Sequence, residues 1–431
     1  MLWYRIIGDD AIHYRLFSVF IFILTLPFLF LFARRLFKSD LAGWIAICLY
    51  SSSPYYHYFA QEARYYILWA FLIILLHYLF LIAASENKLK WWIGYTLIGI
   101  LNLYASVLSG LVIISHFIYI LLLRKNRWLL FTTSAFLILL AYLPWLISII
   151  NHRSEIVTAL AWHSRLGSGL NIFSLLFVQL LFMAASFIGG FNALLGILLS
   201  LNLQGNYAQI SITIFLVALI IYSIIYVIKK LSKDKSIFLI LILLPQLIFF
   251  VVSDIIRNTG GSLFYRYNVI TFIGILFFLI YVISRKIELG KVLYFVFFFG
   301  IIVFGFNTIL NDSKNRCWNT PFYCEEIIQG AQLFSSHERQ LLILDYSKVT
   351  GINFEGFLTL VNEYKSKNID FLLATPDIKN VEGIISGNNY SAIYLSNTSN
   401  ELLENLKSQF GESIDSLDTQ GILPTWRINI E

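Results

Sequence analysis

The chain has 431 residues, of which 58% are hydrophobic and 13% are charged, and its formal net charge is +6. Its mean hydropathy of +0.74 lies far outside the range of ordinary soluble domains, so a water-soluble enzyme is excluded as the main body of the protein. We expect a polytopic membrane protein.

The charge is divided unevenly along the chain. Residues 1–310 carry 22 Lys and Arg against 9 Asp and Glu, whereas residues 311–431 carry 9 against 16. The pI of 9.0 therefore reflects basic loops between membrane segments, and nucleic acid is not an expected partner. We expect a transmembrane domain over residues 1–310 and an extracytoplasmic domain over residues 311–431.

Apolar segments long enough to cross a membrane follow one another through the first domain. They predict a mainly α, helical bundle of about ten to twelve membrane segments, because the 172–201 stretch reads either as one span or as a span plus a shorter re-entrant or surface helix. The segments cover residues 16–33, 41–59, 65–84, 91–105, 106–123, 128–149, 172–201, 207–228, 236–253, 266–283 and 292–310.

The loops between these segments alternate in charge. The positive-inside rule places the basic loops in the cytoplasm and the loops between them outside, together with the tail from Asn311. The 172–201 stretch must then begin and end on the outer side. The basic loops cover residues 33–40, 86–90, 124–127, 229–235 and 284–291, and the outer loops cover 61–66, 151–171 and 253–267.

The tail alternates short apolar runs with amphipathic stretches. This alternation predicts a small α/β domain with a mainly parallel sheet. Cys317 and Cys324 at its start could form a disulfide if that side of the membrane is oxidising. The predicted strands are 340–349, 369–375, 391–396 and 424–431, and the predicted helices are 354–367 and 400–411.

A polar island interrupts the apolar sequence at "SSSPYYHYFAQEARYY", residues 51–66. We expect a helix to begin near Gln61, so that its free N–H groups and Arg64 form a seat for a phosphate, with Glu62 either orienting Arg64 or acting on a ligand. The alternative is structural, because a Glu at a helix N-terminus is favourable and an outward Arg can snorkel. Tyr55 and Tyr65 fit either sugar stacking or an interfacial aromatic belt.

A second island, "FYRYNVITF" (264–272), also lies at the outer mouth of a span. Arg266 could flank the same anion as Arg64, or it could be a lone snorkelling arginine. His163 lies in the long outer loop and is a candidate ligand contact, although a lone loop histidine is usually solvated. The other histidines show no metal-ligand spacing.

These residues resemble those of a known superfamily. Residues 51–75 are similar to the Ser-Pro, Tyr, Gln-Glu-Ala-Arg, Tyr signature of bacterial GT-C polytopic glycosyltransferases, in the family 39-like branch related to protein O-mannosyltransferases and the aminoarabinose transferase of lipid A. Further resemblances are "GDDAIHYRLFSVFIFIL" (8–24), "AYLPWLISI" (141–149), "YRY" (265–267) and "TWRI" (425–428).

The resemblance implies a multi-pass enzyme of the inner (plasma) membrane. It would transfer a sugar from a polyprenyl-phosphate donor to a lipid, glycan or protein acceptor on the outer side, with inversion at the anomeric carbon. A carboxylate would take the acceptor proton while arginines hold the lipid phosphate. Glu62 would be catalytic; Gln61, Arg64 and Tyr65 would line the active cavity, and Arg266 with Tyr267 the donor-phosphate side. Some relatives use a divalent metal ion, but no ligand set beyond Glu62 is evident.

The resemblance also implies a departure. The family carries its catalytic acidic residue in an outer loop after a first helix, and this chain begins after the place of that loop, with Asp9 and Asp10 only weak substitutes. We therefore expect that the start codon has been misplaced, that the chain is a truncated and inactive gene product, or that the base comes from elsewhere. The rival hypotheses are a transporter or flippase, which should show polar residues at mid-membrane, and a non-catalytic scaffold with the glycosyltransferase fold.

Overall fold

The computed structural model describes parts of two compact units, Met1–Asp312 and Ser313–Glu431; the boundary expected from the sequence lay between residues 310 and 311. In the first unit the described residues are 11–62, 64–153, 179–181, 184, 207–257 and 265–312. In the second they are 313–314, 339–345, 368–375, 378, 390–396, 399–410, 414–417 and 425–428.

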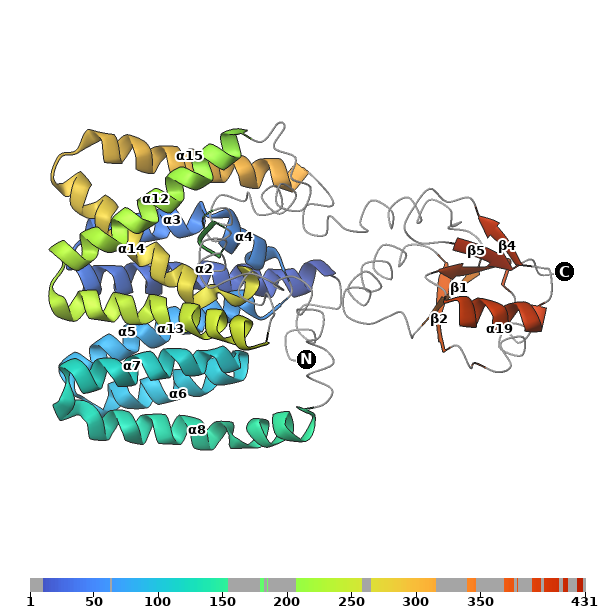
Figure 1. Cartoon of the computed structure of the whole chain (residues 1–431), viewed down its shortest axis with the longest axis horizontal. Coiled ribbons are helices and arrows are strands. Elements are labelled where there is room, and N and C mark those ends of the chain that lie inside the picture. The colour runs from blue at the N-terminus through green and yellow to red at the C-terminus, as the bar shows by residue number, and fades with distance from the viewer. Residues whose placement is uncertain are drawn as a thin grey trace. The chain divides into compact units, whose positions relative to one another are not determined.

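The first unit is a helical bundle whose long helices run back and forth between two ends (Figure 1). Five described segments are long and apolar enough to cross a membrane: Arg15–Phe37, Tyr66–Glu86, Lys125–Asn151, Lys233–Arg257 and Val269–Glu288. A total of about ten to twelve spans stays a prediction. The helices are α2 (Ala11–Phe37), α3 (Asp40–Ser51), α4 (Pro54–Gln61), α5 (Tyr66–Glu86), α6 (Leu89–Ala105), α7 (Gly110–Leu123), α8 (Trp128–Asn151), α12 (Tyr207–Lys230), α13 (Lys233–Arg257), α14 (Val269–Glu288) and α15 (Val292–Lys314).

One predicted membrane segment is divided in two. The sequence predicts a continuous segment over residues 41–59, but α3 ends at Ser51 and the short helix α4 begins at Pro54. Proline has no backbone N–H and favours the first turn of a helix, so Pro54 starts α4 instead of continuing α3. Most of the predicted 172–201 segment lies outside the described residues.

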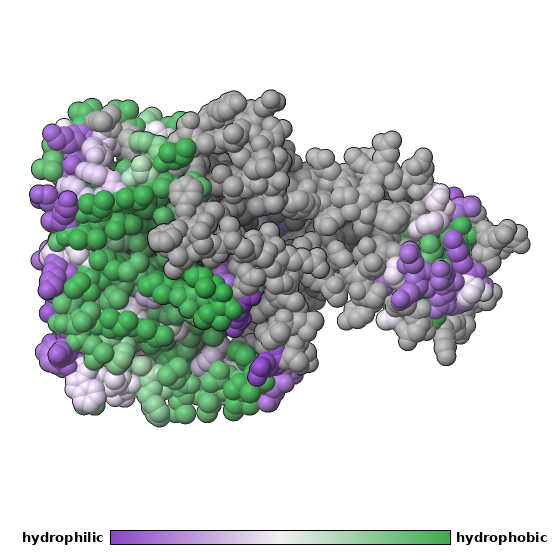
Figure 2. All heavy atoms as spheres, viewed as in Figure 1, coloured by the Kyte–Doolittle hydropathy of each residue, from purple (hydrophilic) through white to green (hydrophobic). Residues whose placement is uncertain are grey.

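Contacts between separate loops show that the basic loops gather at one end of the bundle, here called the basic end. Arg35 donates to Ser85 at 2.8 Å, and Arg124 pairs with Asp234 at 3.1 Å. In Figure 2, hydrophilic side chains line this end, and hydrophobic side chains cover much of the visible helix faces. The loops that the charge rule assigns to one side of a membrane therefore share one end of the bundle, while the side itself stays a prediction.

The core of the bundle centres on α14. Every residue from Val269 to Ser284 is buried, as expected for a helix that is apolar on all sides, and its neighbours include α3, α5, α12 and α13. At α15, Gly305 allows an unusually close approach, because a Cβ there would lie 2.0 Å from the backbone oxygen of Ser52. This contact joins α15 to the break between α3 and α4.

Two histidines lie buried in the middle of the bundle. His77 Nδ1 lies 2.9 Å from His116 Nε2, and the Tyr95 hydroxyl lies 3.1 Å from His116 Nδ1. The ring of Phe80 stacks on His116 at 3.8 Å, and Phe238 packs edge-on against His77. Three of the four ring nitrogens thus have polar partners between aromatic rings, whereas His77 Nε2 has no hydrogen-bond partner within the described part of the chain. The pair has an interhelical packing role that the sequence did not reveal.

The described part of the second unit forms a five-stranded mixed sheet in the order β2-β1-β3-β5-β4. β1 pairs in parallel with β2 and β3, whereas β5 pairs antiparallel with β3 and β4. The expected mainly parallel sheet is therefore parallel in only half of its pairings, and β4 was not expected. Predicted helix 354–367 and residues Cys317 and Cys324 lie outside the described residues. The elements are β1 (Gln340–Asp345), β2 (Ile369–Ala374), β3 (Ala392–Ser396), α19 (Asn400–Phe410), β4 (Ile414–Leu417) and β5 (Thr425–Ile428).

Candidate functional site

The first arm of the site is the short connection between α4 and α5, at the end of the bundle opposite the basic end. The sequence predicts that a helix begins near Gln61, but Gln61 is the last residue of α4 and α5 begins only at Tyr66. Glu62 is extended, with φ −89° and ψ 129°, because α4 has ended there. Arg64 consequently precedes the N-terminus of α5 instead of lying in its first turn.

This connection holds an ion pair. Arg64 Nε lies 3.5 Å from Glu62 Oε1, and the exposed fractions of the two side chains are 30% and 16%. Glu62 Oε2 is buried and has no hydrogen-bond partner within the described part of the chain. The backbone oxygen of Glu62 accepts a 2.8 Å hydrogen bond from the hydroxyl of Ser18, which fixes the connection to α2. The carboxylate thus keeps one oxygen for a further partner.

The second arm is the 3₁₀ turn η5 (Tyr265–Tyr267), which precedes α14. The guanidinium of Arg266 lies 5.1 Å from the ring centroid of Tyr267, within cation–π range. Arg266 also lies close enough for its charge to act on Glu62 and on Tyr65. The structure therefore brings Glu62, Arg64 and Arg266 together although some 200 residues separate the two arms.

Buried amides hold the second arm in place. Gln246 of α13 is fully buried; its amide nitrogen donates to the backbone oxygen of Tyr267, and its oxygen accepts from Thr271 N at 2.9 Å and Thr271 Oγ1 at 3.1 Å. Gln179 donates to Asn268 at 3.2 Å. Sequence reasoning missed these residues. The sequence did contain a signal for Gln246: it stands beside Pro245 inside an apolar run, where an amide without a hydrogen-bond partner would be costly, so a buried partner could have been expected.

The electrostatics of the site centre on Glu62. Burial raises the pKa of its carboxyl above the ordinary value, and the charges of Arg64 and Arg266 oppose part of that rise. The carboxylate is thereby made a better proton acceptor near neutral pH while it stays next to two cations. An anion that entered between the arginines would meet two guanidinium groups with planar, multidentate donors.

The tyrosines of the first arm differ in their surroundings. Tyr55 is 3% exposed, and its ring stacks on Phe272 of α14 at a centroid distance of 3.9 Å. It therefore packs beneath the site, and contact with a substrate stays a prediction. Tyr65 is 42% exposed and lies 4.4 Å from the ring of Tyr66, which leaves much of its side chain accessible.

The described residues give little support for a bound metal ion. Within the parts of the chain that the structure describes, no three His, Cys, Asp or Glu side chains lie together. Glu62 has two arginine charges beside it, and these oppose a divalent cation. Glu62 between Arg64 and Arg266 therefore does not fit a divalent metal ion. His163, Asp9 and Asp10 lie outside the described residues.

Comparison with known families gives a match over the N-terminal part of the chain. Residues 1–150 match the family model for dolichyl-phosphate-mannose-protein mannosyltransferases. This region contains the first arm with Gln61, Glu62, Arg64 and Tyr65, but not η5. The match supports a membrane glycosyltransferase of the GT-C type, in agreement with the apolar helices. A comparison with curated proteins finds no match for the chain.

Proposed function

We propose that the protein is a membrane glycosyltransferase that transfers a sugar from a polyprenyl-phosphate donor to a lipid, glycan or protein acceptor. The observation that carries the proposal is the convergence of Glu62, Arg64 and Arg266 at one end of the bundle. The family match over residues 1–150 supports the class of reaction. Lys and Arg gather at the other end of the bundle, the basic end, which supports a cytoplasmic location for that end. We therefore assign this site, and the C-terminal domain, to the outer side of the plasma membrane.

The two arginines bind the phosphate of the donor. As the bond between the sugar C1 and the phosphate oxygen breaks, negative charge builds up on the phosphate, and guanidinium groups already in place stabilise it. Arg64 belongs to the connection before α5, and Arg266 is held by the turn that Gln246 fixes. Because the arms come from distant parts of the chain, both must be correctly folded for the leaving group to be held.

Glu62 acts as the base. Its carboxylate takes the proton of the acceptor hydroxyl while the hydroxyl oxygen forms a new bond to C1, and the lipid phosphate leaves with the electron pair of the broken bond. Attack opposite the leaving group inverts the anomeric carbon. The raised pKa of Glu62 brings the carboxyl nearer to neutral pH, where a base can be both ionised and effective.

Neighbouring side chains position the sugar. The exposed ring of Tyr65 offers a stacking surface, and Tyr267 lies against Arg266 on the donor side. Gln61, at the end of α4, supplies an amide that can bond sugar hydroxyls. We also assign His163 a substrate contact, and no step here depends on a divalent metal ion.

Binding of an unglycosylated polyprenyl phosphate tests the phosphate seat. We expect Arg64→Ala and Arg266→Ala each to weaken binding at least tenfold, the ~1.5–3 kcal/mol of a charge-assisted hydrogen bond. Arg257→Ala is the matched control, because Arg257 is an exposed arginine at the same end of the bundle, on α13. Native mass spectrometry measures binding, and thermal melting confirms that each variant is folded.

The variant Glu62→Gln separates chemistry from binding. We expect it to keep polyprenyl-phosphate binding and to abolish sugar transfer, because the amide cannot take a proton. Loss of binding in this variant would instead assign Glu62 to orienting Arg64. Equal binding of the polyprenyl phosphate by Arg64→Ala, Arg266→Ala and Arg257→Ala would reject the assignment of Arg64 and Arg266 to the phosphate site. Binding without transfer by the wild type would favour a scaffold, and movement of the lipid across vesicles would favour a flippase.

A further inference from the structure

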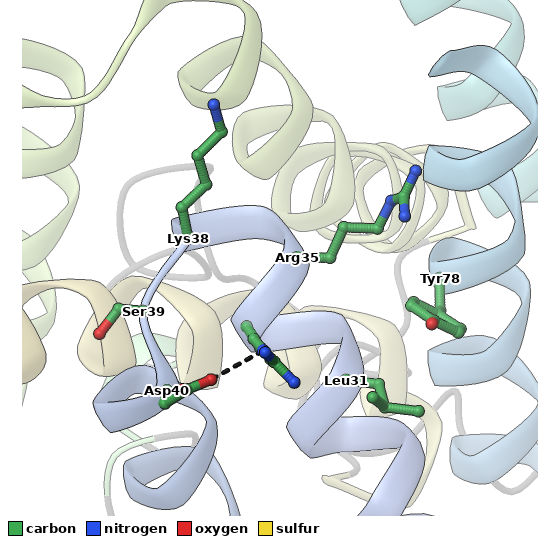
Figure 3. A pocket seen from close by; sticks show the side chains of 7 residues that line it. Leu31, Arg35, Lys38, Ser39, Asp40 and Tyr78 are labelled. Atoms are coloured by element: carbon green, nitrogen blue, oxygen red, sulfur yellow. Dashed lines mark ion pairs between the residues drawn. The ribbon is translucent and has the colours of Figure 1, made fainter. Parts of the chain in front are cut away.

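A second polar site lies at the basic end of the bundle, opposite the candidate active site. There the C-terminus of α2 and the start of α3 line an open pocket of about 550 Å³ that Tyr78 of α5 also borders (Figure 3). The pocket has an apolar wall and a charged rim. Its lining residues are Leu31, Arg34, Arg35, Lys38, Ser39, Asp40 and Tyr78.

The lining side chains themselves carry excess positive charge, while Ser39 donates a 2.6 Å hydrogen bond to the carboxylate of Glu288 outside the lining. Three of the lining side chains are cationic and one, Asp40, is anionic. Asp40 pairs with Arg34 at 2.7 Å, and Arg35 contacts Glu86 at 3.4 Å. Lys38 forms no ion pair within the described parts of the chain, and the charge of half-buried Lys235 lies close enough to act on it. An incoming anion would therefore relieve repulsion between two lysines.

The backbone of Lys38 is in an unfavourable conformation. Its φ is +57°, in the left-handed region, and its N–H donates to the oxygen of Arg34 at 2.8 Å to close α2. Glycine is the favoured residue at such a helix end, and any other L residue costs about 1 kcal/mol there. A glycine would therefore be more favourable for the turn itself than the lysine that is present.

An exposed apolar stripe leads to the pocket. The exposed positions along α2 recur every three or four residues, which places them on one helix face. The stripe from Leu16 to Leu31 is about 22 Å long and ends directly below Arg34 and Arg35. In a helix long and apolar enough to cross a membrane, such a face contacts acyl chains. Its members are Leu16, Phe20, Ile23, Pro27 and Leu31.

We propose that this pocket binds the phosphate headgroup of an anionic membrane phospholipid, whose acyl chain lies along the α2 stripe. The phosphate contacts Lys38 and the free donors of Arg34 and Arg35, in the leaflet at the basic end. Basic pockets between transmembrane helices suit such headgroups, because the bilayer supplies the ligand at high local concentration. The stripe selects a lipid over a free phosphate, which has no apolar part to bury.

The test measures binding of phosphatidylglycerol and phosphatidylcholine to the delipidated protein by native mass spectrometry. We expect phosphatidylglycerol to bind more tightly, and Lys38→Gly to weaken it about fivefold, equivalent to the ~1 kcal/mol that one lysine contributes near an anionic lipid. This variant also relieves the backbone, so its melting temperature should not fall. Asp40→Asn should tighten binding, because it removes the opposing charge.

Lys125→Gly is the control, because Lys125 is an exposed lysine at the same end but outside the pocket. Equal binding of the two phospholipids, or equal weakening by Lys38→Gly and Lys125→Gly, would overturn the proposal. Displacement of phosphatidylglycerol by millimolar inorganic phosphate would also overturn it in favour of a soluble anion. Should Lys38→Gly fail to fold, the opposite sign expected for Asp40→Asn still decides the matter.

Discussion

The substitution Gln246→Leu tests how the bundle fixes the second arm of the site. It keeps the volume of the buried side chain but leaves the backbone oxygen of Tyr267 and the N–H of Thr271 without their partner. Each unsatisfied group costs about 1–3 kcal/mol, so two would cost about 2–6 kcal/mol. The Thr271 hydroxyl can turn to the Tyr267 oxygen four residues earlier, so one group stays unsatisfied and we expect a loss of about 1–3 kcal/mol.

Thermal unfolding in detergent and polyprenyl-phosphate binding together measure this effect. We expect Gln246→Leu to lower the melting temperature and to weaken binding, because Arg266 belongs to the turn that is released. Adding Thr271→Val removes the rescuing hydroxyl and should destabilise more than the two single changes combined. A loss below ~0.6 kcal/mol, the average for hydrogen bonds between membrane helices, together with unchanged binding, would refute the reasoning.

Three further predictions concern other parts of the chain. Sugar transfer should rise with pH through a value above that of an ordinary carboxyl, because protonated Glu62 cannot accept a proton, and a pH–rate profile without this limb would contradict the assignment. Gly305→Ala should lower the melting temperature by clashing with backbone, at about 1–3 kcal/mol, whereas Gly300→Ala, which meets no atom within 4 Å, should not. Asp345→Ala should speed hydrogen exchange in α19, because buried Asp345 accepts hydrogen bonds from both the N–H and the hydroxyl of Ser399; unchanged exchange would exclude this anchoring role.

The positions of the helices could be predicted because hydropathy is a local property of the sequence. The predicted segments outside 172–201 correspond to helices, but the break at Ser52 was missed, although Pro54 marked it, and α14 begins at Val269 instead of residue 266. The polar loops could be assigned to the two ends of the bundle because the Lys and Arg content of each loop is also a local property of the sequence. Helix starts were less accurate: the onset of α5 at Tyr66 depends on packing of the connection before it, as the Ser18 hydrogen bond to Glu62 shows.

Contacts between distant residues were harder to predict. Glu62 and Arg64 stand together in the sequence, but Gln246 and Thr271 interact across two helices, and His77 and His116 pair at a separation of 39 residues. Each such side chain looks like an isolated polar residue in an apolar run. In the sheet, β4 was missed because "IDSL" is short and half polar, and it is defined by pairing with β5.

The central claim is that one lipid-linked phosphate binds between two arginines from distant parts of the chain. Electron cryomicroscopy of the protein in nanodiscs with a polyprenyl phosphate tests it most directly. The account predicts phosphate density within hydrogen-bond distance of both Arg64 and Arg266, with Glu62 beside it. Phosphate density at another place, or arginines that lie apart with no anion between them, would contradict it.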